Sequence, residues 1–160
     1  MRNPASTIAA TAIRPYETAD HAECLAVWLS ASRTGHPFLS EADLAEQKPL
    51  VADLYLPSAE NWVAMGTDGR LLGFIGLLDT GTHAHIGGLF VDPRAHGRGV
   101  GRALVEHAAA LKGVLTVEVY ESNGAVRFYE RCGFRPTGRR ERDDQGRALP
   151  LLTLFRDAPL

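Results

Sequence analysis

Three glycines at alternate positions, Gly97, Gly99 and Gly101, stand between an apolar segment and a segment with the helical spacing of apolar residues. Glycine adopts positive φ angles at little cost and carries no side chain, so its backbone can approach a ligand closely. The first N–H groups of a helix have no partner within the helix, and the helix dipole places about half a positive charge there. The three glycines therefore predict a loop that binds a phosphate or a pyrophosphate.

The spacing of these glycines narrows the choice of ligand. A loop for nucleoside triphosphates requires a lysine after its last glycine, and this sequence has Arg102 there. A dinucleotide loop requires Gly-x-Gly-x-x-Gly and an acidic residue at the end of the next strand. Here the spacing is Gly-x-Gly-x-Gly, and Glu118 lies inside an apolar strand. Three interpretations of the glycine loop remain: a dinucleotide site, a tight turn that binds no ligand, and a site for another phosphate-bearing ligand.

Histidines and cysteines supply the other candidates for chemistry. His83 and His85 are two residues apart in a predicted strand, so they share one of its faces, and a neutral imidazole accepts a proton near neutral pH. Cys24 and Cys132 are distant in sequence and lack the spacing of metal ligands. We expect two free thiols and no metal site, with a disulfide between the two cysteines as the alternative.

The pattern of apolar residues predicts the elements that position these groups. We expect strands at residues 11–16, 62–65, 71–78, 83–91 and 114–120, and two more on either side of the turn at 143–146. We expect helices from residue 18 or 20, after a cap at Ser40, at 100–111 and at 123–132. This order predicts a mixed α/β (α+β) fold with helices on both faces of a mixed sheet. The strands at 83–91 and 114–120 should be parallel neighbours, because a helix connects them.

The composition limits the class of protein. A chain of 160 residues with 45% hydrophobic content suits one domain, which we place at residues 11–160 after a disordered segment at 1–10. A formal net charge of −2 gives no reason to expect nucleic acid or an anionic membrane as a partner. No segment approaches the roughly 18 to 20 apolar residues of a membrane span, so we expect a cytoplasmic protein.

Two segments resemble the signatures of the GNAT N-acetyltransferases. His96-Gly97-Arg98-Gly99-Val100-Gly101 resembles the motif of that superfamily, which reads Arg or Gln, two residues, Gly, one residue, and Gly or Ala. The segment at 123–134 resembles the second signature of the superfamily, and the likeness extends over about residues 12–155. The stretches at 35–39 and 138–154 resemble a small bacterial subgroup. The resemblance implies a twisted mixed sheet of six to seven strands with about four helices.

The resemblance also implies a function and a set of site residues. Acetyl-CoA would be the acyl donor, without a metal, and a primary amine of a small molecule or peptide would attack it directly in a ternary complex. Arg94, Arg98 or Arg102 would meet phosphate charge, and the strand edge at 89–91 would pair with the pantetheine arm. The implied CoA-binding residues are Leu89, Phe90, Val91, His96, Gly97, Arg98, Gly99, Val100, Gly101, Arg102, Asn123 and Tyr129.

The same resemblance places Tyr129 beside the thioester sulfur, where its hydroxyl would act as general acid. Many relatives have a carboxylate that acts as the general base on the strand before the glycine loop, but residues 86–89 contain no carboxylate. His85 is therefore our candidate for the general base. His36 and Phe38 are expected to line the pocket for the acceptor amine.

Two positions depart from the pattern of the superfamily. His96 replaces Arg or Gln, and Asn123 lies six rather than seven residues before Tyr129, so either Ser122 or Asn123 would contact the pantetheine. The shorter turn and the missing carboxylate motivate an alternative function, a non-catalytic CoA-binding module for regulation or interaction. The mixed charges at 139–144 predict a solvated hairpin. The apolar segment at 149–155 predicts an edge strand that could pair with another copy, so monomer and homodimer are both open.

Overall fold

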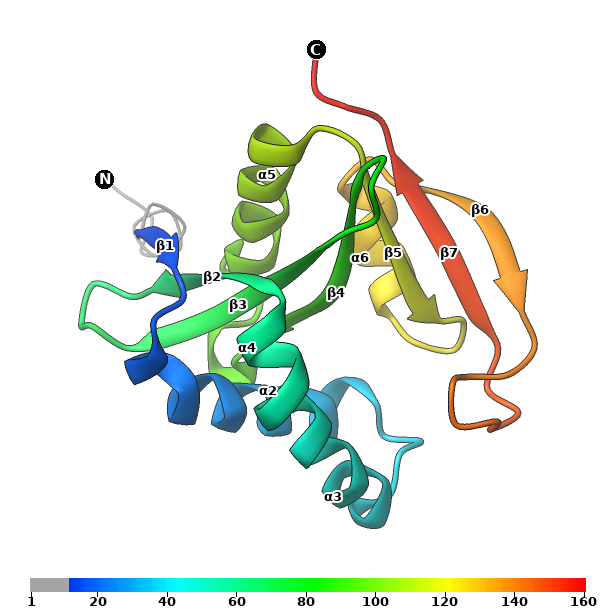
Figure 1. Cartoon of the computed structure of the whole chain (residues 1–160), viewed down its shortest axis with the longest axis horizontal. Coiled ribbons are helices and arrows are strands. Elements are labelled where there is room, and N and C mark those ends of the chain that lie inside the picture. Colours follow the sequence, from blue (N-terminus) through cyan, green and yellow to red (C-terminus); the bar gives the residue numbers. More distant parts are fainter. Residues whose placement is uncertain (1–11) are drawn as a thin grey trace.

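One sheet organises the chain. The computed structural model describes residues 12–160, and the disordered segment predicted at residues 1–10 lies outside them. The described strands follow the spatial order β1-β2-β3-β4-β5-β7-β6, and only β4 and β5 are parallel neighbours (Figure 1). The strands are β1 (Ile13–Pro15), β2 (Glu60–Met65), β3 (Leu71–Asp79), β4 (Ala84–Val91), β5 (Leu115–Tyr120), β6 (Arg135–Arg140) and β7 (Leu151–Arg156). The predicted mixed sheet and its parallel pair are confirmed.

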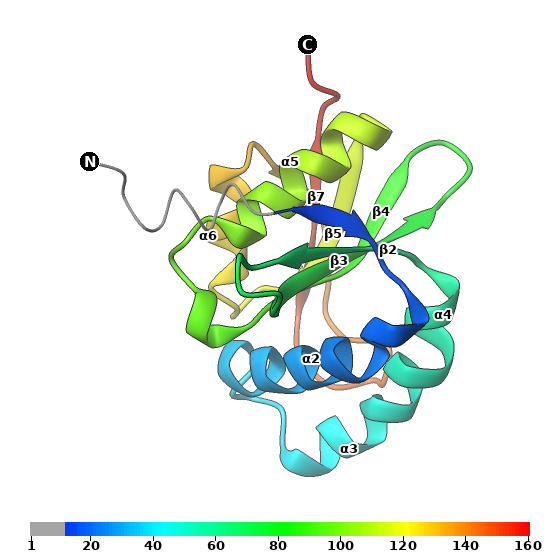
Figure 2. The same cartoon turned by 90° about the vertical axis from the view of Figure 1, so that its left-hand side faces the viewer.

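Helices cover both faces of this sheet. α2 and α5 lie on opposite faces in Figure 2. α3, the π-helical turn η2 and α4 follow one another without a break, and Ser40 caps this run by accepting a hydrogen bond from Asp43 N–H at 3.0 Å. The helices are α2 (His21–Gly35), α3 (Glu41–Leu50), η2 (Val51–Tyr55), α4 (Leu56–Ser58), α5 (Val100–Lys112) and α6 (Ala125–Arg131), with short 3-10 turns η1 (Thr18–Asp20) and η3 (Pro93–Ala95).

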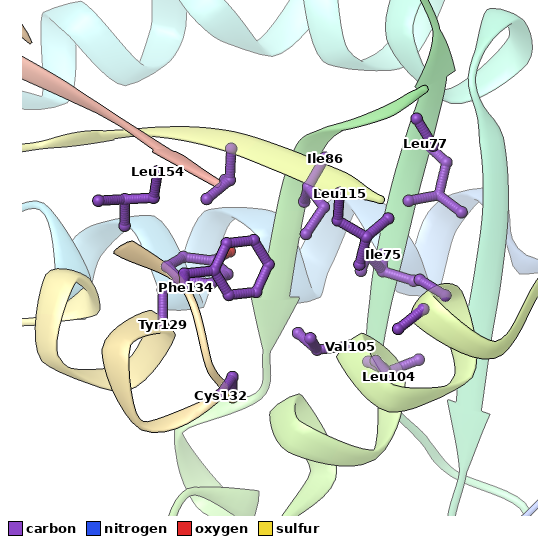
Figure 3. Close-up of a cluster of buried hydrophobic side chains, with 14 of the residues drawn as sticks. Ile75, Leu77, Ile86, Leu104, Val105, Leu115, Tyr129, Cys132, Phe134 and Leu154 are labelled. Atoms are coloured by element: carbon purple, nitrogen blue, oxygen red, sulfur yellow. The ribbon is translucent and has the colours of Figure 1, made fainter. Parts of the chain in front are cut away.

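The sheet separates two hydrophobic cores. Successive side chains of a strand point to opposite faces, and on β3 Phe74 packs with the core of α2 whereas Ile75 packs with the core of α5. The core on the α5 side extends from Leu104 on α5 to Tyr129 and Leu154 (Figure 3). Burial on both faces fixes the register of the central strands, because a shift by one residue would exchange their two faces.

Two details differ from the sequence-based expectations. β7 lies between β5 and β6, so the apolar segment predicted as an edge strand is an inner strand, and Leu154 is fully buried. The edge is β6, whose residues are mostly exposed. The apolar spacing at 100–111 also predicts that Leu111 lies on the buried stripe of its helix. In α5, however, Leu111 is 50% exposed whereas Val105 and Ala109 are buried, because the helix turns their side toward β2–β5.

Candidate active site

A cleft begins where β4 and β5 separate. The parallel ladder joins only residues 84–86 to residues 115–117. Beyond it β4 stays paired with β3 and β5 with β7, so the edge of β4 at residues 87–91 faces the gap. A β-bulge places Gly88 opposite Gly76 and Ile86 opposite Leu77, which leaves Gly87 as the extra residue. Such a bulge bends the strand, and a cleft of about 1120 Å³ lies at this point.

The glycine loop closes one end of the cleft. Gly97 has a φ angle of 77° and Gly99 one of 80°, the left-handed conformation that glycine adopts without strain. α5 begins at Val100, so the N–H groups of its first turn lie at the loop. A Cβ atom at Gly101 would lie 3.1 Å from Phe128 Cζ. Gly97 and Gly99 therefore shape the loop, whereas Gly101 lets α6 pack closely against α5.

The side chains at the loop have different surroundings. His96 Nε2 lies 3.2 Å from the carbonyl oxygen of Val91, a contact that ties the loop to the end of β4. Arg94 forms an ion pair with Asp92 at 2.8 Å. Arg94 and Arg98 line a separate cavity of about 270 Å³, whereas Arg102 lines the main cleft. Of the three arginines, Arg102 is thus placed to meet an anion in the cleft.

Most of the residues predicted from the sequence come together in this one cleft. Phe38 and Arg98 are not among its lining residues; Phe38 supports the wall from behind, with ring centroids 5.6 Å from His36 and 4.9 Å from Tyr120. Asn123 lines the cleft and Ser122 does not, and Asn123 Oδ1 already accepts a hydrogen bond from Ala125 N–H at 2.9 Å. The predicted residues that line the cleft are His36, His85, Leu89, Phe90, Val91, His96, Gly97, Gly99, Val100, Gly101, Arg102, Asn123 and Tyr129.

Tyr129 stands at the junction of the cleft and the core. Only 5% of its surface is exposed, and its ring packs against Phe128 and Phe134 with centroid distances of 5.1 and 5.2 Å. Figure 3 shows Cys132 in the same cluster. Burial raises the pKa of the Tyr129 hydroxyl and the pKa of the Cys132 thiol. Both groups keep their protons at neutral pH, which suits Tyr129 to proton donation and makes Cys132 a poor nucleophile.

Two histidines lie within hydrogen-bonding distance of one threonine: His85 on β4 and His83 just before it both contact Thr116 on β5. Thr116 Oγ1 lies 2.8 Å from His85 Nδ1 and 3.0 Å from His83 Nε2. His85 lines the cleft, and His83 is not among the lining residues. Burial lowers the pKa of the His85 imidazole, although the nearby Glu118 carboxylate acts in the opposite direction. His85 is therefore neutral at pH 7 and able to accept a proton.

Carboxylates gather where β5 and the last hairpin line the cleft. Glu118 on β5 and Asp143 and Asp144 in the last hairpin line the cleft. Arg140 on β6 joins two of them, at 2.6 Å from Glu118 and 3.0 Å from Asp144. Together with Arg147, which lies 3.3 Å from Asp143, this part of the protein carries three carboxylates and two guanidinium groups, and the excess of negative charge favours a cationic ligand.

Comparison with known proteins decides the family. A family model described as an acetyltransferase (GNAT) domain matches residues 57–136. The peptidyl-lysine N-acetyltransferase YjaB of Salmonella typhimurium is 44% identical over 132 residues, which are 82% of this chain and 88% of that protein. The chain belongs to the GNAT acetyltransferase family. It is an N-acetyltransferase, and the non-catalytic module is set aside.

Solved structures of GNAT proteins have the same fold. The solution structure of apo-form YjaB from Escherichia coli has a TM-score of 0.79 and 40% identity, covering 91% of this chain and 97% of that chain. The PaiA N-acetyltransferase of Thermoplasma acidophilum in complex with coenzyme A has a TM-score of 0.77, with coverage of 92% and 99%. Its identity is 16%, so this likeness shows the fold alone.

The acyl donor of this GNAT enzyme is acetyl-CoA. The structure fits such a ligand, because the glycine loop offers bare amide groups and the edge of β4 at residues 87–91 is not paired with another strand of the described chain. Residues 12–160 contain no group of three or more His, Cys, Asp or Glu side chains arranged to hold a metal ion. Within the same residues, no helix combines the length and apolarity that crossing a membrane requires.

Tyr55 is a cleft residue of this GNAT enzyme that the sequence analysis did not identify. It ends η2, and π-helical turns are frequent at functional sites. A Cβ atom at Gly87 would lie 2.7 Å from Tyr55 Cε2, and one at Gly88 would lie 3.2 Å from its Oη. This hydroxyl is buried without a hydrogen bond to any described residue. Gly87 and Gly88 inside the predicted strand at 83–91 were the signal, because a strand glycine often admits a close neighbour.

Most of the hairpin at 139–144 is exposed as expected, and Asp143 is its buried exception. It is 6% exposed and accepts a hydrogen bond from the Tyr120 hydroxyl at 3.1 Å. Its carboxylate also lies 3.3 Å from Arg147, which forms a second ion pair at 2.7 Å with Asp43 on α3. The hairpin of this enzyme is therefore fastened to α3, and the two elements form one wall at the carboxylate end of the cleft.

Proposed function

We propose that this GNAT enzyme transfers the acetyl group of acetyl-CoA to the side-chain amine of a lysine in a peptide or protein, by direct attack in a ternary complex. The observation that carries the proposal is a single cleft that joins the glycine loop to the Glu118 and Asp144 carboxylates. An alkylammonium group is attracted to such a carboxylate wall. The name of the YjaB relative, a peptidyl-lysine N-acetyltransferase, supports the same class of acceptor.

On the donor side, backbone groups do most of the binding. The amides at residues 97–101 would hold the pyrophosphate, and Arg102 would add a charge-assisted hydrogen bond. The edge of β4 at residues 87–91 would bind the amides of the pantetheine arm as an additional strand would. The loop follows β4 after only the short turn η3, so a donor held by both would point its thioester toward the separation of β4 and β5.

On the acceptor side, the amine must lose its charge before it attacks. A lysine amine has a pKa of about 10.4, so its deprotonation at pH 7 costs about 4.6 kcal/mol without assistance. Glu118 would attract the ammonium group, and His85 would accept its proton. Because Thr116 occupies His85 Nδ1, the nitrogen left for the substrate is Nε2.

Tyr129 would complete the reaction on the donor side. The thiolate that leaves when the amide bond forms requires a proton, and the buried Tyr129 hydroxyl carries one at neutral pH. A buried cysteine thiol does not compete with the amine as nucleophile, so no acetyl-enzyme intermediate is invoked at Cys132.

An assay of free CoA thiol tests the proposal. The acceptors are a lysine peptide with a blocked N-terminus, the same peptide with arginine in place of lysine, and small polyamines. We expect CoA release and side-chain acetylation with the lysine peptide alone. If only the polyamines react, the peptide assignment is wrong; if acetyl-CoA binds and no amine reacts, the whole proposal is wrong.

A pair of variants locates the acceptor end. Glu118→Gln removes a carboxylate from the cleft, and we expect its kcat/KM for the lysine peptide to fall about 10-fold, a loss of about 1.4 kcal/mol. Glu121→Gln is the matched control, because Glu121 also pairs with an arginine, at 3.0 Å, but does not line the cleft. Equal rates for the two variants would contradict the assigned acceptor end.

A further inference from the structure

A continuous chain of hydrogen-bonding groups leads from the cleft to the protein surface. It begins at His85, which lines the cleft, and passes through Thr116 Oγ1 to His83 Nε2 over steps of 2.8 and 3.0 Å. On the other side of the His83 ring, Nδ1 lies 2.9 Å from Thr82 Oγ1 and 3.2 Å from Thr80 Oγ1. Both of these threonines are exposed. The chain therefore has one end in the cleft and one end in solvent.

One set of proton positions satisfies every link of this chain. His85 Nδ1–H donates to Thr116 Oγ1, the Thr116 hydroxyl donates to His83 Nε2, and His83 Nδ1–H donates to Thr82 Oγ1. A hydroxyl can donate and accept at once, and an imidazole can accept at one nitrogen while it donates from the other. All three distances lie in the normal range for hydrogen bonds.

We propose that His85, Thr116 and His83 form a proton relay that carries the proton released by amine acetylation from the cleft to solvent. The inference rests on the proposed function. The ammonium group of the acceptor loses two protons as it becomes an amide; one ends on the CoA thiol, and the other must leave the protein. His85 Nε2 accepts that proton from the acceptor while Nδ1 passes its own to Thr116. The hydroxyl proton of Thr116 moves to His83 Nε2, and the Nδ1 proton of His83 leaves to the surface.

The surroundings of His85 favour a path by which it can pass a proton on as it accepts one. Burial disfavours the doubly protonated imidazole and lowers the pKa of His85. Glu118 on β5 acts in the opposite direction but is paired with Arg140, and His83 on the other side lowers the pKa further. A ring that holds a second proton poorly accepts one more easily if it passes another on at the same time. Thr116 is the group in position to receive it.

Two substitutions at Thr116 separate the hydroxyl from the shape of the side chain. Thr116→Val keeps the branched side chain that suits a strand but removes the hydroxyl, and Thr116→Ser keeps the hydroxyl. We expect kcat/KM for the lysine peptide to fall at least about 10-fold in Thr116→Val and to stay within about 2-fold in Thr116→Ser. Thr137→Val, on the exposed edge strand β6, is the control for loss of a threonine hydroxyl from the sheet.

Substitution of His83 distinguishes a relay from simple orientation of His85. His83→Gln still bonds to Thr116 but cannot pass a proton from one ring nitrogen to the other. We expect it to lower kcat/KM as far as Thr116→Val does, and the double variant to be no slower than either. If Thr116→Val is slow while His83→Gln is as fast as the unchanged enzyme, Thr116 only orients His85 and the relay is wrong.

A measurement without substrate keeps this test independent of the proposed function. Nitrogen NMR of the imidazole rings identifies which nitrogen carries the proton. The relay requires the Nδ1–H tautomer for both His85 and His83 in the unchanged enzyme. An Nε2–H tautomer at either ring would overturn the relay even if the lysine peptide is acetylated. Correct tautomers without any acetylation would overturn the proposed function instead.

Discussion

At the scale of single residues, the Tyr129 hydroxyl is the group whose loss should affect the chemical step most selectively. We predict that Tyr129→Phe lowers kcat at saturating acetyl-CoA by a factor of about 10² to 10⁴, because the leaving thiolate then lacks its proton donor. The ring remains to pack against Phe128 and Phe134, so the thermal midpoint of unfolding should change little. Steady-state kinetics and a thermal melt measure both effects.

Tyr16→Phe provides the control for this substitution. The Tyr16 hydroxyl contacts His21 Nδ1 at 3.2 Å, and Tyr16 is not among the residues that line the cleft. Its removal should leave kcat unchanged. An unchanged kcat in Tyr129→Phe would remove Tyr129 from the mechanism.

Some site residues could be predicted from the sequence and others could not, because only the first group stands in local sequence patterns. Gly97, His85 and Tyr129 stand in local patterns, a glycine spacing, a strand period and a signature, and the structure places them all in one cleft. Asp143 looks like any turn aspartate in sequence, because its burial depends on Tyr120 and Arg147 closing over it. Such residues are recognised only when distant segments meet.

At the scale of elements, the glycine loop predicts a separable effect on donor binding. Gly97→Ala places a side chain at a φ angle of 77°, where we expect a loss of about 1 kcal/mol in the free energy of unfolding. It also alters the phosphate loop, so the KM for acetyl-CoA should rise about 10-fold, whereas kcat should change less. Denaturation in urea and initial rates at varied acetyl-CoA test the two effects.

Gly69→Ala imposes the same backbone strain elsewhere. Gly69 has a φ angle of 81° in the turn between β2 and β3, and neither glycine has an atom within 4 Å of an added Cβ. The control should lose similar stability and keep its KM for acetyl-CoA. A raised KM in both variants would mean that strain, rather than the loop, controls donor binding.

The helices and strands themselves were largely predictable from the sequence, whereas the pairing of strands in the sheet was less predictable. Glycine turns, the cap at Ser40 and apolar periods mark helices and strands through local physics, and these elements are confirmed. The prediction that β7 is an edge strand was wrong, because β7 lies between β5 and β6. No local pattern in the sequence states which strands will pair with an apolar segment. The bulge at Gly87 and the separation of β4 from β5 depend in the same way on strand pairing.

At the scale of the whole molecule, Arg147 connects parts of the chain that are far apart in sequence. It bonds to Asp43 on α3 and to Asp143, whose side chain is 2% exposed. We predict that Arg147→Ala lowers the free energy of unfolding by about 1.5 to 3 kcal/mol, because a buried carboxylate loses a charged partner. Arg142→Ala, which removes an exposed contact to the Gly146 carbonyl, should cost much less in the same urea titration. Equal losses would show that the wall is not held by Arg147.

Three partly buried histidines predict how the stability of the molecule depends on pH. Burial lowers the pKa values of His36, His85 and His107 below the ordinary value near 6.5. As the pH falls through that value, the unfolded chain binds protons that the folded chain does not, so the free energy of unfolding decreases. The urea midpoint should therefore fall between about pH 7.5 and pH 5.5.

His107 allows this pH dependence to be checked. Its Nε2 is buried without a hydrogen bond to a described residue, and its ring lies 4.5 Å from the Trp62 ring. His107→Phe keeps a ring against Trp62 and removes the titrating group, so its midpoint should fall less over the same pH range. An equal fall in both proteins would show that His107 does not contribute.

The most direct test of the central claim is a crystal structure with a conjugate of CoA and a lysine peptide, joined through the lysine side-chain nitrogen. We predict the pyrophosphate on the amides of residues 97–101, the pantetheine arm along β4 at residues 87–91, and the lysine entering past Glu118 with its nitrogen facing His85. A conjugate bound with its pyrophosphate away from the glycine loop, or with its peptide leaving the cleft on another side, would contradict the account.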